Sequence, residues 1–155
     1  MLGTYVTIAT CNLNQWALDF EGNRDRIIES IRQAKALNAR LRVGPELEVC
    51  GYGCLDHFAE NDVYRQLWQM YAQILEHPDC QDIILDVGMP IIHKLIKYNC
   101  RILSYNKKIL YIRPKLHLAN DGNYREMRYF TPWNRVRYHE DYLLPKEIQQ
   151  ITCQK

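Results

Sequence analysis

The sequence predicts an α/β protein in which helices are layered on a mixed β-sheet. Short apolar or β-branched segments alternate with amphipathic segments over the first half of the 155 residues. Two later apolar segments, Cys100–Ser104 and Lys108–Ile112, flank Tyr105-Asn106-Lys107, as expected for a β-hairpin. A strand–helix–strand–helix order followed by a hairpin is typical of a layered sandwich with parallel and antiparallel strands in one sheet.

Three short segments before this hairpin are predicted strands. The first, Tyr5–Cys11, is rich in β-branched and apolar residues. Leu41–Val43 is broken by a Gly-Pro pair, and Ile83–Met89 is closed by Pro90. Because proline has no amide proton for a strand partner, it is expected to end a strand.

Two segments have the spacing of amphipathic helices. In Arg24–Leu37 and Val63–Leu75, apolar residues recur every three or four positions and polar residues fill the other face. His77-Pro78 is expected to end the second helix. A further element begins at Leu143–Ile148, with no later strand to receive it. We therefore expect residues 1–155 to be one part of a single, larger domain.

The composition excludes several classes of protein. The chain is 47% hydrophobic and 25% charged, and its net charge of +2 is too small to favour nucleic acid or an anionic membrane as a partner. No apolar segment approaches the roughly 18–20 residues that span a bilayer. The first residues lack the pattern of a secretory signal, so a cytoplasmic location is expected.

The six cysteines are expected to be reduced. Cys11 and Cys100 lie in or beside apolar segments, where a free cysteine behaves as a small hydrophobic residue. Cys50 and Cys54, with His57 close behind, have some likeness to metal ligands. A second ligand pair at a standard spacing is missing, so the sequence predicts neither a disulfide framework nor a zinc site.

Two sites along the chain share one layout that suits catalysis. In Val43–Glu46 and in Ile112–Lys115, an apolar strand runs into a proline, and a charged residue follows directly. A proline fixes the local backbone, and α/β sheets gather active sites at the carboxyl ends of their strands. Glu46 and Lys115 are therefore candidates to meet in one pocket as a general base and a cation that stabilises a developing oxyanion.

A simpler interpretation stays open for each of these residues. Charged residues that follow proline at strand ends are common on protein surfaces. A second carboxylate, Glu126, lies beyond Lys115 between Arg125 and Arg128, and either arginine is a suitable partner for it on a solvated face. The pattern alone leaves all three as candidates.

Three long segments carry a resemblance to a known family. They are Cys11–Asn23 (CNLNQWALDFEGN), Gly44–Cys54 (GPELEVCGYGC) and Arg113–Glu126 (RPKLHLANDGNYRE), and Phe130–Trp133 (FTPW) continues the match. In this order they resemble the amino-terminal glutaminase domain of eukaryotic glutamine-dependent NAD synthetases. That domain is a nitrilase-like carbon–nitrogen hydrolase, so the resemblance implies an α-β-β-α sandwich, incomplete in this chain.

The resemblance implies roles for the candidate residues. In the family, a glutaminase domain releases ammonia from glutamine, and a synthetase domain uses it with ATP and magnesium to amidate nicotinic acid adenine dinucleotide. Glu46 matches the glutamate that shuttles protons, and Lys115 matches the lysine that stabilises the tetrahedral intermediate. Glu126 matches a supporting carboxylate. The family also implies a homo-oligomer, whereas no cofactor is expected on this segment.

The resemblance breaks at the nucleophile. The family's catalytic cysteine follows a strand beyond the segments matched here, and none of the six cysteines occupies that context. Cys153, near the end, follows Gln149–Thr152 and lacks the expected strand and turn. The synthetase domain is missing as well. We therefore expect this chain alone to be inactive, and two alternatives stay open: a non-catalytic interaction module, or a stand-alone amidase of the same superfamily.

Overall fold

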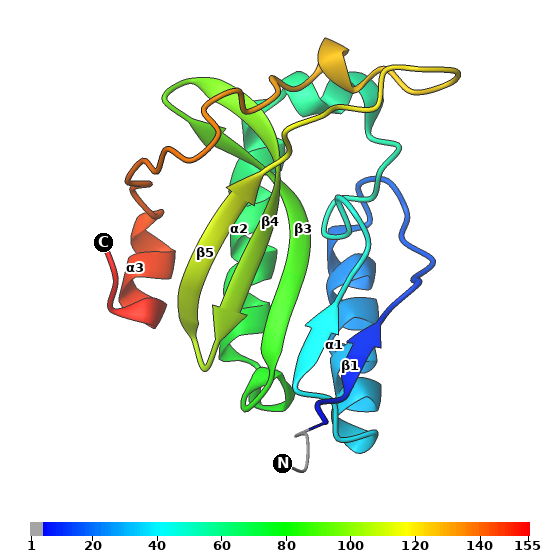
Figure 1. Cartoon of the computed structure of the whole chain (residues 1–155), viewed down its shortest axis with the longest axis vertical. Helices are drawn as coiled ribbons and strands as arrows, with labels where there is room; N and C mark the ends of the chain where they lie inside the picture. Colours follow the sequence, from blue (N-terminus) through cyan, green and yellow to red (C-terminus); the bar gives the residue numbers. More distant parts are fainter. Residues whose placement is uncertain (1–4) are drawn as a thin grey trace.

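The computed structural model describes residues 5–155, and these form one mixed sheet with helices packed on it (Figure 1). These residues contain three α-helices and five strands, the last three strands in succession, with short 3₁₀ turns at Leu55–Ala59, Pro78–Cys80 and Glu126–Arg128. In chain order, the elements are β1 (Ile8–Thr10), α1 (Phe20–Ala36), β2 (Leu41–Val43), α2 (Asn61–Glu76), β3 (Ile84–His93), β4 (Ile96–Tyr105), β5 (Lys108–Pro114) and α3 (Lys146–Thr152).

The strand order explains why both long helices lie on one face. The sheet runs β1-β2-β3-β4-β5, with β1, β2 and β3 parallel and the last two strands antiparallel to their neighbours. Parallel strands are joined by right-handed crossovers, and both crossovers here step in the same direction across the sheet. Helices α1 and α2 therefore cover the same face, and α3 lies beside β5 (Figure 1). The described residues thus form one α layer and one β layer of the four expected.

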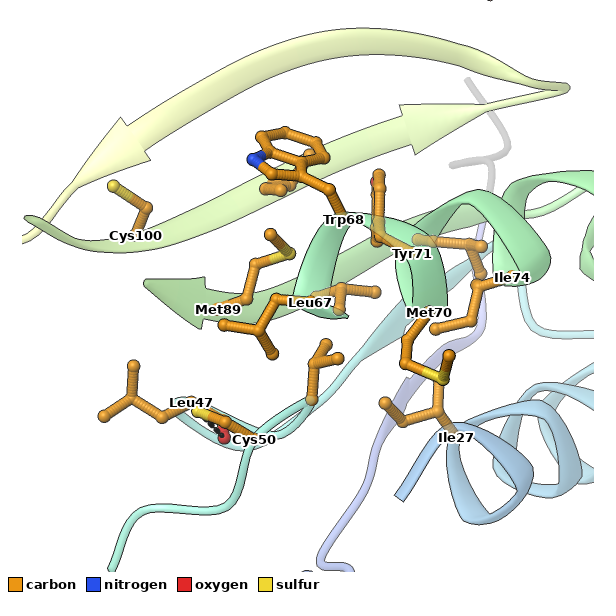
Figure 2. Packing of buried hydrophobic residues seen from close by; sticks show 14 of the residues in the cluster. Ile27, Leu47, Cys50, Leu67, Trp68, Met70, Tyr71, Ile74, Met89 and Cys100 are labelled. Atoms are coloured by element: carbon orange, nitrogen blue, oxygen red, sulfur yellow. Dashed lines mark hydrogen bonds between the residues drawn. The ribbon is translucent and has the colours of Figure 1, made fainter. Parts of the chain in front are cut away.

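The hydrophobic core lies between these helices and the sheet. Figure 2 shows Leu67 of α2 directed toward Met89 of β3, and Met70 directed toward Ile27 of α1. Leu67, Ile27 and Met89 are completely buried. Each fully buried side chain of this size stabilises the fold by about 1.5–3 kcal/mol. Because burial of one face stabilises each helix, the helical spacing of apolar residues was sufficient to predict both helices.

Two β-hairpins follow α2, of which the sequence predicted one. Asn106 and Lys107 form the predicted turn with φ of 45° and 64°, the left-handed conformation typical of two-residue hairpin loops. Lys94 and Leu95 form a second such turn, with φ of 49° and 67°. The expectation that the next strand begins at Cys100 was therefore wrong, because β4 already begins opposite β3 at Ile96.

The prediction that Pro90 closes its strand was also wrong. Strand β3 continues through Pro90 to His93 and pairs with β4 along its whole length. The N–H of Gly88, two residues earlier, points away from β4 toward the loop after β2. By the two-residue period of a strand, the nitrogen of Pro90 faces the same side, and β2 has already ended there. No ladder hydrogen bond is lost.

Helix α1 begins at Phe20, four residues before the predicted start. The sequence from Glu21 to Asn23 contains glycine and asparagine, which are weak helix formers. The buried Asn23 amide accepts a hydrogen bond from the Trp16 N–H and donates to the carbonyls of Trp16 and Val49. These contacts with distant loops hold the first turn in place. The first strand is shorter than predicted, because it pairs with β2 only from Ile8 to Thr10.

The face of the sheet opposite the helices is only partly covered, and we call it the open face. Arg42 points toward α1, where it binds Ser30, so its neighbours Leu41 and Val43 point the other way. By cross-strand pairing, the open face carries Ile8, Leu41, Val43, Ile84, Leu103 and Tyr111. Of these, Ile8 is 56% exposed and Tyr111 is 42% exposed.

Candidate active site at the carboxyl ends of β2 and β5

The backbone after β2 crosses close over β3 and presents Glu46. We call residues 44–47 the strap. A Cβ added to Gly88 of β3 would lie 2.6 Å from the Pro45 carbonyl oxygen, so only glycine allows this approach. Arg101 of β4 holds the strap from the open face by donating to the carbonyls of Gly44 and Pro45, at 2.9 and 2.8 Å.

A buried ion pair supports the strap from the helix side. Arg42 donates to both carboxylate oxygens of Glu48, at 2.9 and 2.8 Å, and both side chains are fully buried. Glu48 also accepts the N–H of Gly88 at 3.2 Å. A buried pair of this kind is tolerated only with its hydrogen bonds satisfied, and here the satisfied bonds connect the strap to β2 and β3.

Strand β5 ends at Pro114 and presents Lys115 beside Glu46. The Lys115 N–H donates to the Asn99 carbonyl at 2.8 Å, which fixes the backbone after the proline. Its ammonium lies 2.7 Å from Glu46 Oε1 and 2.9 Å from Glu126 Oε2. The structure therefore brings Glu46 and Glu126 together around the ammonium of Lys115.

Glu126 is a buried member of this cluster and not a surface partner of the neighbouring arginines. It is 3% exposed, and its carboxylate accepts the Ala119 N–H at 2.7 Å and the Tyr52 hydroxyl at 2.7 Å. Arg125 donates to nearby backbone carbonyls, and Arg128 pairs with an exposed aspartate. The simpler interpretation of Glu126 was therefore wrong.

The two carboxylates differ in proton affinity. Burial raises the pKa of Glu46, and Glu126 adds to this rise, while Lys115 opposes it. Burial also acts to raise the pKa of Glu126, but hydrogen bonds from Tyr52 and its other partners outweigh it and lower the pKa. Glu126 is thus the ionised partner of the ammonium, and Glu46 is the carboxyl that takes up a proton first. A carboxylate with a raised pKa suits a general base.

Lys115 keeps its charge in this setting. Burial lowers the pKa of an ammonium, but hydrogen bonds with Glu46 and Glu126 outweigh burial and raise the pKa of Lys115. The cluster borders a cavity of about 480 Å³, which Asn99, Arg113 and His117 also line. A fixed cation at the wall of a cavity is suited to stabilise an anionic oxygen on a bound substrate.

No cysteine thiol among residues 5–155 is hydrogen-bonded to Glu46, Lys115 or Glu126. Cys100 is among the residues that line the cavity, but it pairs with Met89 on the helix face of the sheet and is buried in the core (Figure 2). Burial raises its pKa, which disfavours the nucleophilic thiolate.

Three further cysteines are placed away from the cluster or have thiols held by the backbone. The thiols of Cys50 and Cys54 donate to backbone carbonyls of their own loop. Cys153 ends α3, where Thr152 accepts a hydrogen bond from Lys108 at the start of β5. Lys115 lies at the other end of that strand, roughly 20 Å away at about 3.3 Å per residue.

Two residues of the cluster, Tyr52 and Asn99, were not singled out from the sequence. Tyr52 lies six positions after Glu46, and its hydroxyl reaches Glu126 only because the loop folds back. Asn99 lies within β4, and the structure buries it to 2% exposure. A polar side chain inside an apolar strand is a recognisable signal of a buried hydrogen-bonding role.

Comparison with known protein families places the chain in an enzyme class. The profile of the carbon–nitrogen hydrolase family matches residues 7–154, so the chain belongs to the carbon–nitrogen hydrolase family. Within residues 5–155, no helix is both long and apolar enough to cross a bilayer.

Curated relatives of the chain include glutamine-dependent NAD(+) synthetases. The chain is 64% identical over 150 residues to the enzyme of Saccharomyces cerevisiae and 58% identical over 154 residues to that of Homo sapiens. These matches cover 97% and 99% of this chain but only 21% and 22% of the two enzymes. The chain thus spans about a fifth of the length of the curated relatives it matches.

Solved structures show the same fold. The glutamine-dependent NAD(+) synthetase of Cytophaga hutchinsonii superposes with a TM-score of 0.83 at 33% identity, covering 91% of this chain and 24% of that one. An amidase of Nesterenkonia superposes with a TM-score of 0.72 at 21% identity, covering 87% of this chain and 51% of that one. The expected nitrilase-like α/β fold is therefore confirmed for the described residues.

Proposed function

We propose that this chain supplies the general base and the cation of a glutamine-hydrolysing site, as the amino-terminal part of a glutamine-dependent NAD synthetase. The contact between Lys115 and Glu46 at the carboxyl ends of β5 and β2 carries the proposal. The proposal is supported by the match to the yeast synthetase, which is 64% identical over 150 residues and covers 97% of this chain.

The geometry suits amide hydrolysis through a thioester. A thiol would attack the side-chain amide of glutamine, and Glu46 would accept the thiol proton and deliver it to the leaving ammonia. Lys115 would stabilise the negative oxygen of the tetrahedral intermediate, while Glu126 holds the ammonium. Water activated by Glu46 would then release glutamate. In this proposal the thiol would come from polypeptide outside residues 5–155, because no cysteine thiol there is hydrogen-bonded to the cluster and Cys100 is a buried thiol with a raised pKa.

The released ammonia would be used elsewhere in the whole enzyme. We propose that a synthetase domain, with ATP and magnesium, uses it to amidate nicotinic acid adenine dinucleotide, and that the whole enzyme is a cytoplasmic homo-oligomer. Solved relatives include a glutamine-dependent NAD+ synthetase of Acinetobacter baumannii in complex with ADP. No residue of this chain is assigned to that nucleotide.

A chimera tests this function with an internal control. The matching 150 residues of the yeast synthetase are replaced by those of this chain, and NAD formation is measured with glutamine and with free ammonia. We expect both reactions in the chimera, and Glu46→Gln or Lys115→Met to reduce the glutamine reaction by about a thousandfold or more. The ammonia reaction should be unchanged. Glutamine-dependent synthesis that survives Glu46→Gln would overturn the proposal.

The 155-residue chain alone provides a second test. Because no thiol faces Glu46 and Lys115, we expect the purified chain not to hydrolyse glutamine. Turnover that Glu46→Ala abolishes would contradict this expectation, since it would require a nucleophile within these residues.

A second candidate is a non-catalytic module that binds other protein surfaces. The exposed apolar side chains of the open face, Ile8 and Tyr111, favour it. Co-purification of this chain with an intact synthetase under native conditions would support such a role, and its absence would count against it.

A further inference from the structure

Asn99 is a buried polar residue at the centre of the cluster that the proposed chemistry leaves unused. It lies in β4 opposite Pro90 and is 2% exposed. Burying an amide without hydrogen-bond partners is costly, so an asparagine at such a position requires specific partners.

The partners of Asn99 are the three members of the cluster. Its backbone carbonyl accepts the Lys115 N–H at 2.8 Å. Its side-chain nitrogen donates to Glu46 Oε1 and lies 3.5 Å from Glu126 Oε1. The orientation of the amide follows from chemistry, because only its NH₂ end can donate to two carboxylates.

The charges of the cluster explain why a neutral donor is needed there. Two carboxylates surround one ammonium, so the ammonium alone leaves one negative charge uncompensated. The amide of Asn99 adds a donor between the carboxylates without adding a charge. The titratable groups that interact with Glu46 are Lys115, Glu126 and Tyr52, and Arg101, Arg113 and His117 line the same cavity.

We propose that Asn99 is the positioning residue of this site: it holds the Glu46 carboxylate against the Lys115 ammonium and allows the carboxylates of Glu46 and Glu126 to share that ammonium. The placement follows from the contacts alone, and only its effect on glutamine hydrolysis rests on the proposed function. A hydrogen bond to the ionised form of a carboxylate favours that form. Asn99 therefore keeps Glu46 available as a base despite its burial.

Carboxyl-carbon NMR of the 155-residue chain tests this without any enzymatic assay. Asn99→Leu keeps nearly the same size but removes the donor, and Asn99→Asp replaces the donor by a third carboxylate. We expect the titration of Glu46 to move to higher pH in both variants, and further in Asn99→Asp. Ser104→Ala is the matched control, because Ser104 is a buried β4 residue that loses one hydrogen bond, with Tyr71, away from the cluster.

The outcomes separate positioning from a purely structural role. A Glu46 titration that stays in place in folded Asn99→Leu and Asn99→Asp chains would overturn the proposal. If Asn99→Leu does not fold, Asn99→Asp decides, since it preserves the side-chain volume. Unfolding of both variants beside a folded Ser104→Ala chain would also overturn it, because Asn99 would then serve the fold and not the position of Glu46.

The yeast chimera provides the functional readout. We expect Asn99→Leu to lower kcat with glutamine by about tenfold or more, the loss expected for one hydrogen bond to a charged group. The KM for glutamine should change by less than about threefold, and the acidic limb of the pH profile should move to higher pH. If the chimera lacks glutamine-dependent activity altogether, the proposed function fails, while the NMR titration still decides the role of Asn99.

Discussion

The ammonium of Lys115 lies 2.7 Å from the carboxylate of Glu46, although 69 positions separate the two residues in the sequence. Each residue directly follows a proline at the end of a strand or just beyond it, and β2 and β5 lie in the same sheet with β3 and β4 between them. The contact forms because the strap crosses β3 and shifts Glu46 sideways toward β5. Because this geometry depends on charge and on close backbone packing, it is open to direct tests.

Removing the ammonium should destabilise the fold. In Lys115→Met, Glu126 keeps a buried carboxylate with a side-chain exposure of 4% and loses its cation. We expect a loss of about 1–3 kcal/mol in the free energy of unfolding at pH 8, measured by urea denaturation. Lys94→Met is the control: Lys94 pairs with Glu140 but is 67% exposed, so it should cost less than about 1 kcal/mol. Equal losses in the two variants would contradict the buried-cluster interpretation.

The two carboxylates should affect the pH dependence of stability with opposite signs. The pKa of Glu46 is raised in the folded chain from its ordinary value of 4.5, with burial as the main cause. Its contribution to stability is therefore fully present below pH 4.5 and is lost as the pH rises through the folded pKa. Glu46→Gln cannot ionise at this position. Its free energy of unfolding relative to the wild type, measured by urea denaturation, should therefore increase as the pH rises from 4.5 through the folded pKa of Glu46.

Glu126 should behave in the opposite way. Burial acts to raise its pKa, but the hydrogen bonds that it accepts outweigh burial and lower the pKa in the folded chain. Its contribution is present above pH 4.5 and is lost as the pH falls through the folded pKa. Glu126→Gln should therefore be less stable than the wild type at neutral pH, with the difference shrinking in acid. Glu21→Gln, an exposed change on α1, is the control for both variants, and all three are compared by urea denaturation across this pH range. If the unfolding free energies of Glu46→Gln and Glu126→Gln changed with pH in the same direction, the opposite pKa shifts of the two carboxyl groups would be refuted.

The close crossing of the strap over β3 should make Gly88 sensitive to a single methyl group. In Gly88→Ala, the new Cβ would meet the Pro45 carbonyl oxygen at 2.6 Å and the Leu47 nitrogen at 2.7 Å. We expect a loss of about 1–3 kcal/mol from this overpacking, measured by denaturant unfolding. Gly53→Ala is a matched control, since its Cβ would find its nearest neighbour at 4.0 Å. A neutral Gly88→Ala would show that the strap has room to move.

The open face should cause the 155-residue chain to associate. Tyr111 is 42% exposed on β5, beside the other apolar side chains of this face. We expect Tyr111→Lys to shift the chain toward monomer in sedimentation velocity, because it places a charge on the apolar surface. Leu143→Lys, in a loop at 76% exposure, should leave association unchanged. A wild-type chain that is monomeric and melts cooperatively would contradict this expectation.

Much of the fold could be predicted because its signals are local. The helical spacing in α1 and α2, the strand Leu41–Val43 and the turn at Asn106-Lys107 depend on residues within a few positions of one another. The same holds for the strand-end pattern that singled out Glu46 and Lys115. Local periodicity and turn chemistry are properties of the chain itself, so they can be read without a structure.

The errors arose where a distant segment decides the local structure. Pro90 remains inside β3 because β2 ends before it, and helix α1 begins early because Asn23 binds the loop at Val49. Neither condition is visible in the neighbouring residues. Propensity is a weak constraint, and tertiary contacts override it.

The sequence by itself determined the α/β class, the order of the main elements, and the identity of one carboxylate and one ammonium at two strand ends. Only the tertiary structure decided that Glu126 joins them, that Asn99 and Tyr52 bind the cluster, and that no cysteine thiol of residues 5–155 is hydrogen-bonded to it. The physical reason is that a side chain's identity is local, whereas its burial and its partners depend on segments that are remote in the chain and meet only when the sheet forms.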